Sequence, residues 1–345
     1  MKRGFRYLLI LLCMVQLSSC NYKEGQPLRR NVTGKAGGVL VVMSDKSWDD
    51  IPGNLIRKTF GQPQLALPQE EPILDITRIP NEAFKDVFLT TRNILQTRIS
   101  PLVETSGVVF YDNVWAYPQA TVQINARNNE EFEKLFNENS DKLISYFLKA
   151  ERQRLTMNYR QYHERAISST LEEKYDLSLQ AAPGFQLSQE RPNFVWLRFE
   201  TPEISQGLLV YWFPYQSDST FTPNYLLAQR DSFLKANVPG PTPGSFMGTE
   251  RRIDPLFQIT THNGNYAAEM RGLWRVENDF MGGPYLMLAE LDACRKRVVV
   301  VDGYVYAPSK EKRNLLRQVE AMVYSLRFKD QEKNDKINSQ IKMGN

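Results

Sequence analysis

The stretch from Arg297 to Tyr306 reads RVVVVDGYVY and is the clearest β-strand in the sequence. Its four consecutive valines supply the β-branched side chains that favour strands. A helix is predicted to follow at once, beginning near Ser309 and ending near Arg327. A strand followed by a helix indicates an α+β protein, in which helices pack on sheets.

Strand and helix signals alternate along the rest of the chain, which falls into two halves. Between Asn129 and Tyr175, apolar residues recur at helical spacing without an intervening proline. One long helix or two shorter ones are therefore expected to join the halves. Further helices are predicted at residues 51–60 and 224–236, and strands at residues 38–43, 115–125, 194–200, 207–213, 255–261, 267–276 and 285–291, with strand or mixed patterns at residues 73–79 and 87–99.

The two halves resemble each other in the order of these signals. Residues 38–41 (GVLV) and residues 207–210 (GLLV) are each followed by a predicted helix. We therefore expect two α+β units, each a mostly antiparallel sheet with helices on one face, joined by the long helical segment. The first unit should span residues 37–176 and include the long helix, and the second should span residues 177–328. Duplication and chance similarity of common strand-helix units explain the resemblance equally well.

The first 19 residues have the features of a signal peptide. Lys2, Arg3 and Arg6 precede an apolar stretch over residues 7–17. As a helix, that stretch would cover about 16 Å, well short of the roughly 30 Å hydrocarbon core of a bilayer. It closes in Leu-Ser-Ser-Cys, which resembles the lipobox of bacterial lipoprotein precursors, so we expect cleavage before Cys20 and acylation of that cysteine. The alternative is an ordinary cysteine near the cleavage site of a fully secreted protein.

Acyl chains such as palmitate on Cys20 would hold the protein on a membrane without a transmembrane helix, because each buried CH₂ adds about 0.8 kcal/mol. Residues 20–36 would form the lipidated, polar tether, and residues 329–345 a polar tail. Asn21 follows the cysteine in place of the aspartate that retains some lipoproteins on the inner membrane. We expect a lipid-anchored protein of the cell envelope, located on the outer membrane. The sequence does not decide between the periplasmic and the surface side of that membrane.

Processing also changes the charge and the cysteine content. Removing the three basic residues of the signal peptide from the 43 in the chain leaves 40 against 39 acidic residues, a net charge of +1. This balance gives no support for nucleic acid as a partner. With Cys13 removed and Cys20 lipidated, Cys294 remains alone, so the fold is expected to rest on its apolar core rather than on a disulfide.

The sequence lacks the motifs of the common enzyme and cofactor classes. It contains no Walker loop, dinucleotide fingerprint, zincin motif or EF-hand loop. The two histidines, His163 and His262, are too few for a histidine-based metal site. We therefore predict no cofactor and no metal, with His163 on a polar helical surface and His262 at a surface turn.

Two regions are the candidate binding surfaces. Residues 237–252 contain three prolines and three glycines, and residues 271–285 contain an apolar turn tip that is costly to expose. Close-packing turns between strands are the alternative interpretation of both. The candidate binding residues are Pro239, Gly240, Pro241, Gly244, Ser245, Phe246, Met247, Trp274, Met281, Gly282, Gly283 and Pro284.

A short motif suggests a modification. Asp218-Ser219-Thr220 resembles the acceptor motif for O-glycosylation of exported proteins in Bacteroidota, and its setting is typical of a loop. Ser219 is therefore a candidate glycosylation site. Chance occurrence of so short a pattern is the alternative.

Seven short motifs are spread over nearly all of the mature chain: residues 92–95 (RNIL), 230–233 (RDSF), 237–241 (NVPGP), 244–247 (GSFM), 271–274 (RGLW), 281–284 (MGGP) and 302–308 (DGYVYAP). Together they resemble a family of exported Bacteroidota lipoproteins catalogued as domain of unknown function 4837. The resemblance implies a compartment and a lineage. It implies no activity and no catalytic residue.

From these features we expect a non-enzymatic envelope lipoprotein, a binding or assembly module that presents loops to a protein or glycan partner. The alternative is a hydrolase or transferase acting on an envelope polymer, with carboxylates such as Asp279 or Glu250 in a cleft between the units. A structural element of a larger assembly is a third hypothesis, which a large contiguous apolar patch would favour.

Overall fold

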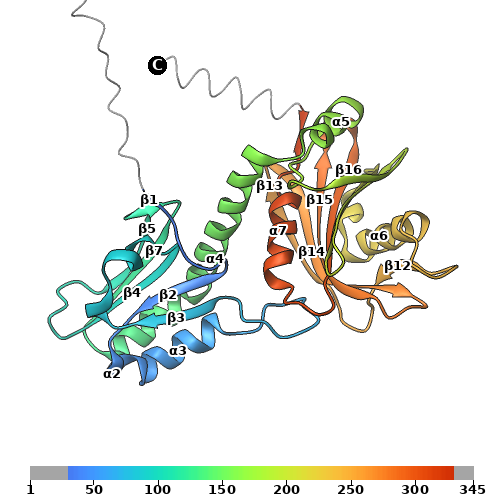
Figure 1. The fold of residues 1–345 in the computed structure, drawn as a ribbon. Helices are drawn as coiled ribbons and strands as arrows, with labels where there is room; N and C mark the ends of the chain where they lie inside the picture. Colours follow the sequence, from blue (N-terminus) through green and yellow to red (C-terminus); the bar gives the residue numbers. More distant parts are fainter. Residues whose placement is uncertain (1–29, 330–345) are drawn as a thin grey trace, which may run out of the picture.

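The computed structural model describes residues 30–329, which form two units lying side by side, each built on its own sheet (Figure 1). The α+β class and the presence of two units are confirmed. The predicted signal peptide, Cys20 and residues 330–345 of the predicted tail lie outside the described residues. Among the helices within residues 30–329, none combines the length and the apolar character needed to span a bilayer.

The first unit contains a five-stranded sheet. Its order is β3 (Asp75–Ile79), β2 (Gly38–Val42), β4 (Asn93–Ile99), β7 (Ala120–Ala126) and β5 (Gly107–Asp112). β2 pairs in parallel with β3 and β4, β4 pairs in parallel with β7, and β5 is antiparallel to β7. The expectation of a mostly antiparallel sheet is wrong for this unit. Helix α3 (Ile51–Phe60) carries the chain back to the edge where β2 began, so β3 runs in the same direction as β2.

Helix α3 and the first half of α4 (Asn129–Tyr162) pack on this sheet, with the short α2 (Asp45–Trp48) preceding α3. The side chain of Asn128 caps α4 by accepting a hydrogen bond from the Glu131 N–H at 2.9 Å. Phe132, Phe136 and Phe147 of α4 are fully buried against the strands. Phenylalanines at helical spacing therefore make the core that the sequence pattern predicted.

The long helical segment predicted between the halves consists of two helices, which was one of the two alternatives expected from the sequence. α4 ends at Tyr162, and α5 (Arg165–Tyr175) begins after a break at His163. Ile167 and Leu171 of α5 pack into the core of the second unit. By packing, the division between the units lies at this break, earlier than the expected boundary after residue 176.

The second unit is built on an eight-stranded antiparallel sheet. RVVVVDGYVY is β16 (Arg297–Tyr306), a central strand bonded to a neighbour on each side along most of its length. The first sheet is mostly parallel whereas this one is antiparallel throughout, and this difference in topology does not support a duplication. The order is β12 (Phe246–Thr249), β14 (Asn265–Glu277), β15 (Gly282–Asp292), β16, β11 (Ser205–Pro214), β10 (Phe194–Glu200) and β9 (Gln186–Arg191), with β13 (Leu256–His262) also paired to β14.

Helices pack on both faces of this sheet, not on one face as expected. Val299 and Val301 of β16 join the core under α5 and α7 (Arg313–Val323). Val298 and Val300 join the core under α6 (Pro223–Asn237). A strand that is apolar on both faces requires cover on both, and Figure 1 shows α7 and α6 on opposite sides of the sheet. Two short ribbons complete the fold, β1 (Arg30–Asn31) with β6 (Ala116–Tyr117) and β8 (Leu177–Ser178) with β17 (Arg327–Phe328).

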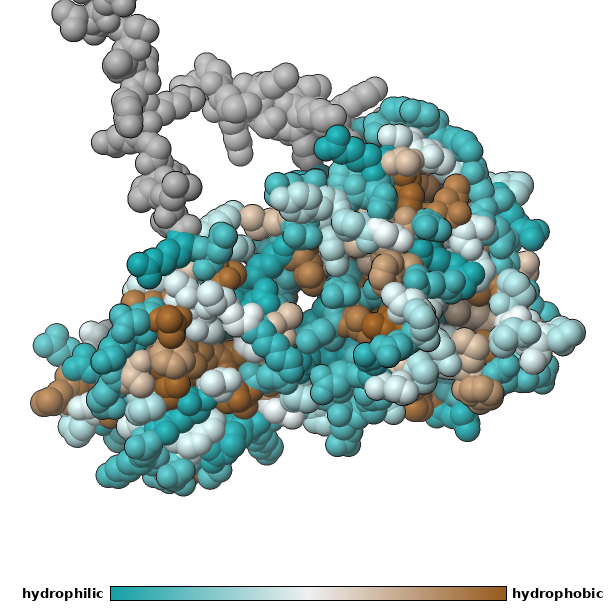
Figure 2. Space-filling view, in the orientation of Figure 1, coloured by the Kyte–Doolittle hydropathy of each residue, from teal (hydrophilic) through white to brown (hydrophobic). Residues whose placement is uncertain are grey.

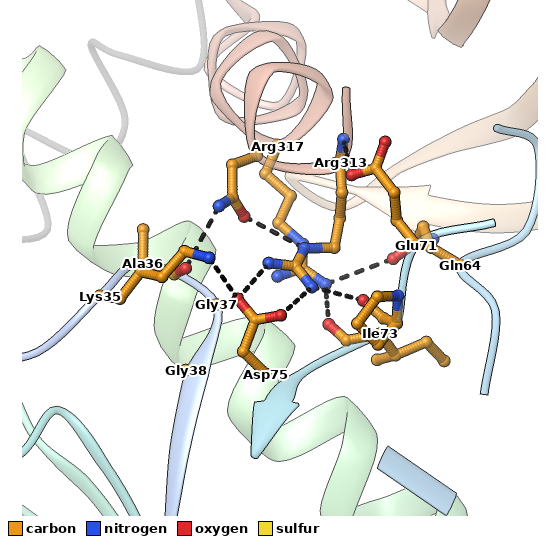
Figure 3. Close-up of polar contacts among 12 residues, drawn as sticks. Lys35, Ala36, Gly37, Gly38, Gln64, Glu71, Ile73, Asp75, Arg313 and Arg317 are labelled. Carbon is orange, nitrogen blue, oxygen red and sulfur yellow. Dashed lines mark hydrogen bonds and ion pairs between the residues drawn. The ribbon is translucent and has the colours of Figure 1, made fainter. Parts of the chain in front are cut away.

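The units meet at a polar junction at the start of α7 (Figure 3). The segment between α3 and β3 reaches across to this helix (Figure 1). Its Glu71 accepts hydrogen bonds from the backbone N–H groups of Lys312 at 2.6 Å and Arg313 at 2.9 Å. Arg313 also pairs with both oxygens of Asp75, at 2.8 and 3.1 Å. A carboxylate of the first unit therefore caps a helix of the second.

Candidate functional site

Several candidate binding residues meet at one pocket in the second unit, which we call the motif pocket. It has a volume of about 440 Å³ and lies where β10, β14 and β16 adjoin the segment that follows α6. Of the predicted binding residues, Pro239, Gly240, Pro241, Met247, Trp274 and Met281 line it, whereas Gly244, Ser245, Phe246, Gly282, Gly283 and Pro284 do not. Lining residues that were not predicted include Trp196, Arg198, Glu200, Tyr304 and Tyr306.

Aromatic rings form one wall of the motif pocket. Trp274 and Tyr304 lie edge to face, with ring centroids 5.6 Å apart. The Trp196 indole N–H donates to the Tyr304 hydroxyl at 3.2 Å. The Trp274 indole N–H donates to the Val305 carbonyl at 3.2 Å. Because both indole N–H groups are bonded within the protein, the rings offer the pocket mainly carbon surface.

The glycines of these motifs allow close packing. A Cβ atom at Gly283 would lie 2.1 Å from the Val305 carbonyl oxygen, and one at Gly240 would lie 2.3 Å from the Ser245 hydroxyl. Neither position leaves space for a side chain. Close packing is therefore the role of Gly240 and Gly283, whereas a Cβ atom at Gly244 would meet no atom within 4 Å.

Residues 237–249 form a tight hairpin rather than a free loop. The Gly240 N–H donates to the Ser245 carbonyl, and the Met247 N–H donates to the Val238 carbonyl, both at 2.9 Å. The second half of the segment is β12, which pairs with the end of β14. This edge strand was not predicted, because the segment is rich in prolines and glycines, which are depleted in strands.

Phe280 directly precedes Met281, which lines the pocket, at the turn between β14 and β15, and 94% of its surface is exposed. The Asp279 carboxylate holds this turn by accepting hydrogen bonds from the N–H groups of Phe280 at 2.6 Å and Met281 at 3.3 Å. The sequence indicated an apolar turn tip here that is costly to expose, but Phe280 itself was not among the predicted site residues. An aromatic side chain presented to solvent next to a pocket with an aromatic wall is typical of an interaction surface.

The two carboxylates suggested for an inter-unit active site, Asp279 and Glu250, lie elsewhere. Asp279 caps the turn at Phe280. Glu250 pairs with Arg252, whose hydrogen bonds lower the pKa of Glu250 to about 2. Both residues belong to the β12–β14 edge of the second sheet, so neither lines the cleft between the units. That part of the enzyme hypothesis is wrong.

A larger cleft of about 600 Å³, the inter-unit cleft, is lined by α4 of the first unit and by β13, β14 and α7 of the second. It contains two carboxylates, Glu269 and Glu320, which Arg271 binds at 2.6 and 3.0 Å. Burial alone would raise the pKa of Glu320, but Arg271 and Arg152 hold it below its usual value. A carboxyl group kept ionised in this way does not supply the proton that a general acid donates.

Both histidines are held by contacts with backbone or side-chain groups of the protein. His163 ends α4, with Nδ1 3.1 Å from the Tyr159 carbonyl. His262, expected at a surface turn, is buried because β13 carries its last residue beneath the end of α7. Its Nδ1 lies 2.7 Å from the Glu290 carboxylate and its Nε2 lies 3.0 Å from the Tyr324 carbonyl. Within residues 30–329, no group of three or more His, Cys, Asp or Glu side chains is placed to hold a metal ion.

The chain matches two known families, and the boundary between the two matches coincides with the boundary between the two units. Residues 32–160 match a family described as a domain of unknown function (DUF8532), and residues 164–325 match another, a domain of unknown function (DUF4837). The boundary falls at the break between α4 and α5. The motif at residues 92–95 lies in the first match, so the resemblance inferred for nearly the whole chain holds for the second unit. No curated protein matches the chain. The second unit, residues 164–325, belongs to the DUF4837 family.

Proposed function

We propose that this protein is a lipid-anchored envelope lipoprotein whose second unit binds a protein partner through the motif pocket and Phe280. The main support is Phe280 itself, 94% exposed at a well-held turn beside a pocket of about 440 Å³. Aromatic anchors next to preformed pockets are typical of the centres of protein interfaces. The partner would cover Phe280 and insert an apolar side chain into the pocket.

The exposed Phe280 and the internal bonding of the indole N–H groups favour a protein over a glycan. Sugar sites need fixed donors and acceptors that point at the ligand hydroxyl groups, yet the Trp196 and Trp274 indole N–H groups are used internally. The other walls include apolar Val238, Met247 and Met281, which suit a peptide side chain, together with polar Thr201, Glu203 and Ser205, which can bond to a peptide backbone. Arg198 and Glu200 also line the pocket, where they pair with each other.

The test is the effect of Phe280→Ser on capture of an envelope partner. Because Phe280 is 94% exposed, the substitution should leave the free energy of unfolding unchanged and weaken partner binding at least tenfold. Leu102→Ser is the matched control, since Leu102 is 80% exposed but lies in the first unit. The partner is identified by pulldown from solubilised envelopes and then titrated, purified, against each variant. Equal affinity of the Phe280→Ser and Leu102→Ser variants would reject the proposal.

The anchor is proposed from the sequence, since Cys20 lies outside the described residues. Lipidation of Cys20 would place the two units on a membrane by a polar tether, with the outer membrane as the proposed location. Cys20→Ala is expected to release the protein from the membrane fraction and to abolish acyl labelling. Retention and labelling that do not change would exclude this anchor.

Ser219 is a proposed site of O-glycosylation. It is exposed in a 3₁₀ turn (Asp218–Phe221), with its hydroxyl 2.7 Å from that of Ser217, and a modifying enzyme needs such exposure. Mass spectrometry of the protein from its native envelope should find a glycan on the peptide that contains Ser219, and Ser219→Ala should remove it.

A further inference from the structure

Among the side chains that line the inter-unit cleft, cations outnumber carboxylates. Arg271 binds Glu269 and Glu320, and Arg152 also pairs with Glu320 at 3.0 Å. These four side chains balance one another. Two further cations that line the cleft, Lys149 and Arg317, make no ion pair with a carboxylate of residues 30–329.

Arg317 is the stronger signal because it is buried, with 9% of its surface exposed. Its Nη2 donates to the Ile73 carbonyl at 2.6 Å and to Gln64 at 3.3 Å, as Figure 3 shows, and both of these residues line the cleft. Its Nη1 is enclosed next to Gly37 and has no hydrogen-bond partner among the described residues, so a ligand in the cleft would meet the Nη2 side of the guanidinium. Burial and the neighbouring Arg313 lower the pKa of Arg317 to about 10. The attraction of Glu320, Glu151 and Asp75 opposes this shift only in part, so burial of the guanidinium still costs free energy of folding. An anion from outside the chain would offset that cost.

Lys149 and Arg317 reach the cleft from different units. Lys149 lies one turn from Arg152 on α4, and Arg317 lies one turn from Glu320 on α7. The Arg152–Glu320 pair joins the two helices, and the Arg152 guanidinium lies 4.3 Å over the ring of Tyr324. In the view of Figure 2, hydrophilic residues dominate the surface where the units meet. Polar side chains that also line the cleft are Gln64, Ser145, Gln258, Thr260 and Thr261.

We propose that the inter-unit cleft binds a small ligand carrying an oxyanion, either a carboxylate or a phosphate, which Lys149 and Arg317 contact from the two units. A guanidinium fork matches both groups, and an ammonium binds either as a point charge. The cleft volume of about 600 Å³ is in the range of small-molecule sites. The cleft shares no lining residue with the motif pocket, so this site is independent of the proposed protein interface.

The experiment uses residues 20–345 with Cys20→Ser, in a buffer free of phosphate and carboxylates. The melting temperature is followed while sodium phosphate or, separately, sodium citrate is added. Sodium chloride at matched ionic strength corrects for screening. A ligand that binds the folded chain raises the melting temperature in a saturable way. A rise with phosphate alone identifies a phosphate-bearing ligand, a rise with citrate alone a carboxylate, and responses to both no larger than that to chloride overturn the proposal.

Variants then locate the binding. Lys149→Gln is expected to weaken binding of the effective anion about threefold to tenfold, the effect of one partly screened charge. The melting temperature without ligand should not change, because Lys149 is exposed. Lys134→Gln removes the same charge from an exposed position earlier on α4 and should not affect binding. Arg317→Gln should weaken binding further, with its stability measured first because it loses charge next to Ile73. Equal affinity of the Lys149→Gln and Lys134→Gln variants would contradict the assignment.

Discussion

At the scale of single residues, Arg230 and Asp302 form a buried ion pair in the second unit. Both side chains are fully buried, with 2.8 Å between Arg230 Nε and Asp302 Oδ2. The Arg230 guanidinium lies 3.6 Å from the centroid of the Tyr285 ring. Burial raises the pKa of Asp302 against the opposing attraction of Arg230. The pair joins α6 to β16, so the RDSF and DGYV motifs serve the core of this unit.

Arg230→Met is expected to lower the free energy of unfolding by about 3–5 kcal/mol, because Asp302 would stay buried without a counter-charge. Adding Asp302→Asn should recover part of that loss, since no uncompensated charge would remain. Urea denaturation of the single and double variants measures both effects. A double variant no more stable than Arg230→Met alone would indicate lost packing rather than an unpaired charge.

Sequence patterns located part of the motif pocket and missed the rest for identifiable reasons. Trp274 and Met281 were predicted because glycine, proline and apolar clusters are local signals. Tyr304 lies in the strand recognised most clearly, but the direction of its ring depends on pairing with strands far away in the chain. Arg317 has the appearance of an ordinary helical surface cation, and only the docked first unit buries it.

At the scale of elements, α7 depends on a residue from the other unit. Lys312, at the N-cap position, makes no side-chain hydrogen bond to the helix, and Glu71 takes that role across the junction. Glu71→Ala should therefore lower the free energy of unfolding by about 1–2 kcal/mol. Glu70→Ala makes the same charge change at an exposed neighbour and is expected to leave stability unaltered. Equal stability of the two variants, measured by urea denaturation, would argue against capping by Glu71.

Most elements were predicted correctly where periodicity was strong. RVVVVDGYVY coincides with β16, and the two helices at residues 129–162 and 165–175 fill the predicted helical segment. β9 was missed because it is an exposed, polar edge strand without an apolar alternation. The parallel order of the first sheet was also missed, since strand direction is set by how the chain crosses between strands rather than by their composition.

At the scale of the whole molecule, the polar junction should make the docking of the units sensitive to acid. Hydrogen bonds from Arg313 lower the pKa of Asp75 in the folded chain. A lowered carboxyl pKa stabilises the fold fully above the unfolded value near 3.9, and this contribution is lost as the pH falls through the folded value. Asp75→Asn should therefore destabilise the protein at pH 7 and much less at pH 3. Asp254→Asn, an exposed control, should have a small and similar effect at both. Urea denaturation at the two pH values provides the comparison.

The expectation of two similar units reflected shared strand-helix order, which many unrelated domains have. The first unit is a mostly parallel sheet and the second an antiparallel sheet covered on both faces. The two family matches, which divide at the α4–α5 break, agree with two distinct domains. The inter-unit cleft could not be predicted, because it exists only through the docking of one domain against the other.

The central claim is that the second unit binds a protein partner at the motif pocket and Phe280, and site-specific photocrosslinking in the native envelope tests it most directly. A photoreactive phenylalanine analogue is placed at Phe280 or, as a control, at Leu102, since both positions are exposed and tolerate a large ring. We predict one discrete crosslinked product of higher mass from position 280 and none from position 102. No product at 280, or the same product from both positions, would contradict the claim.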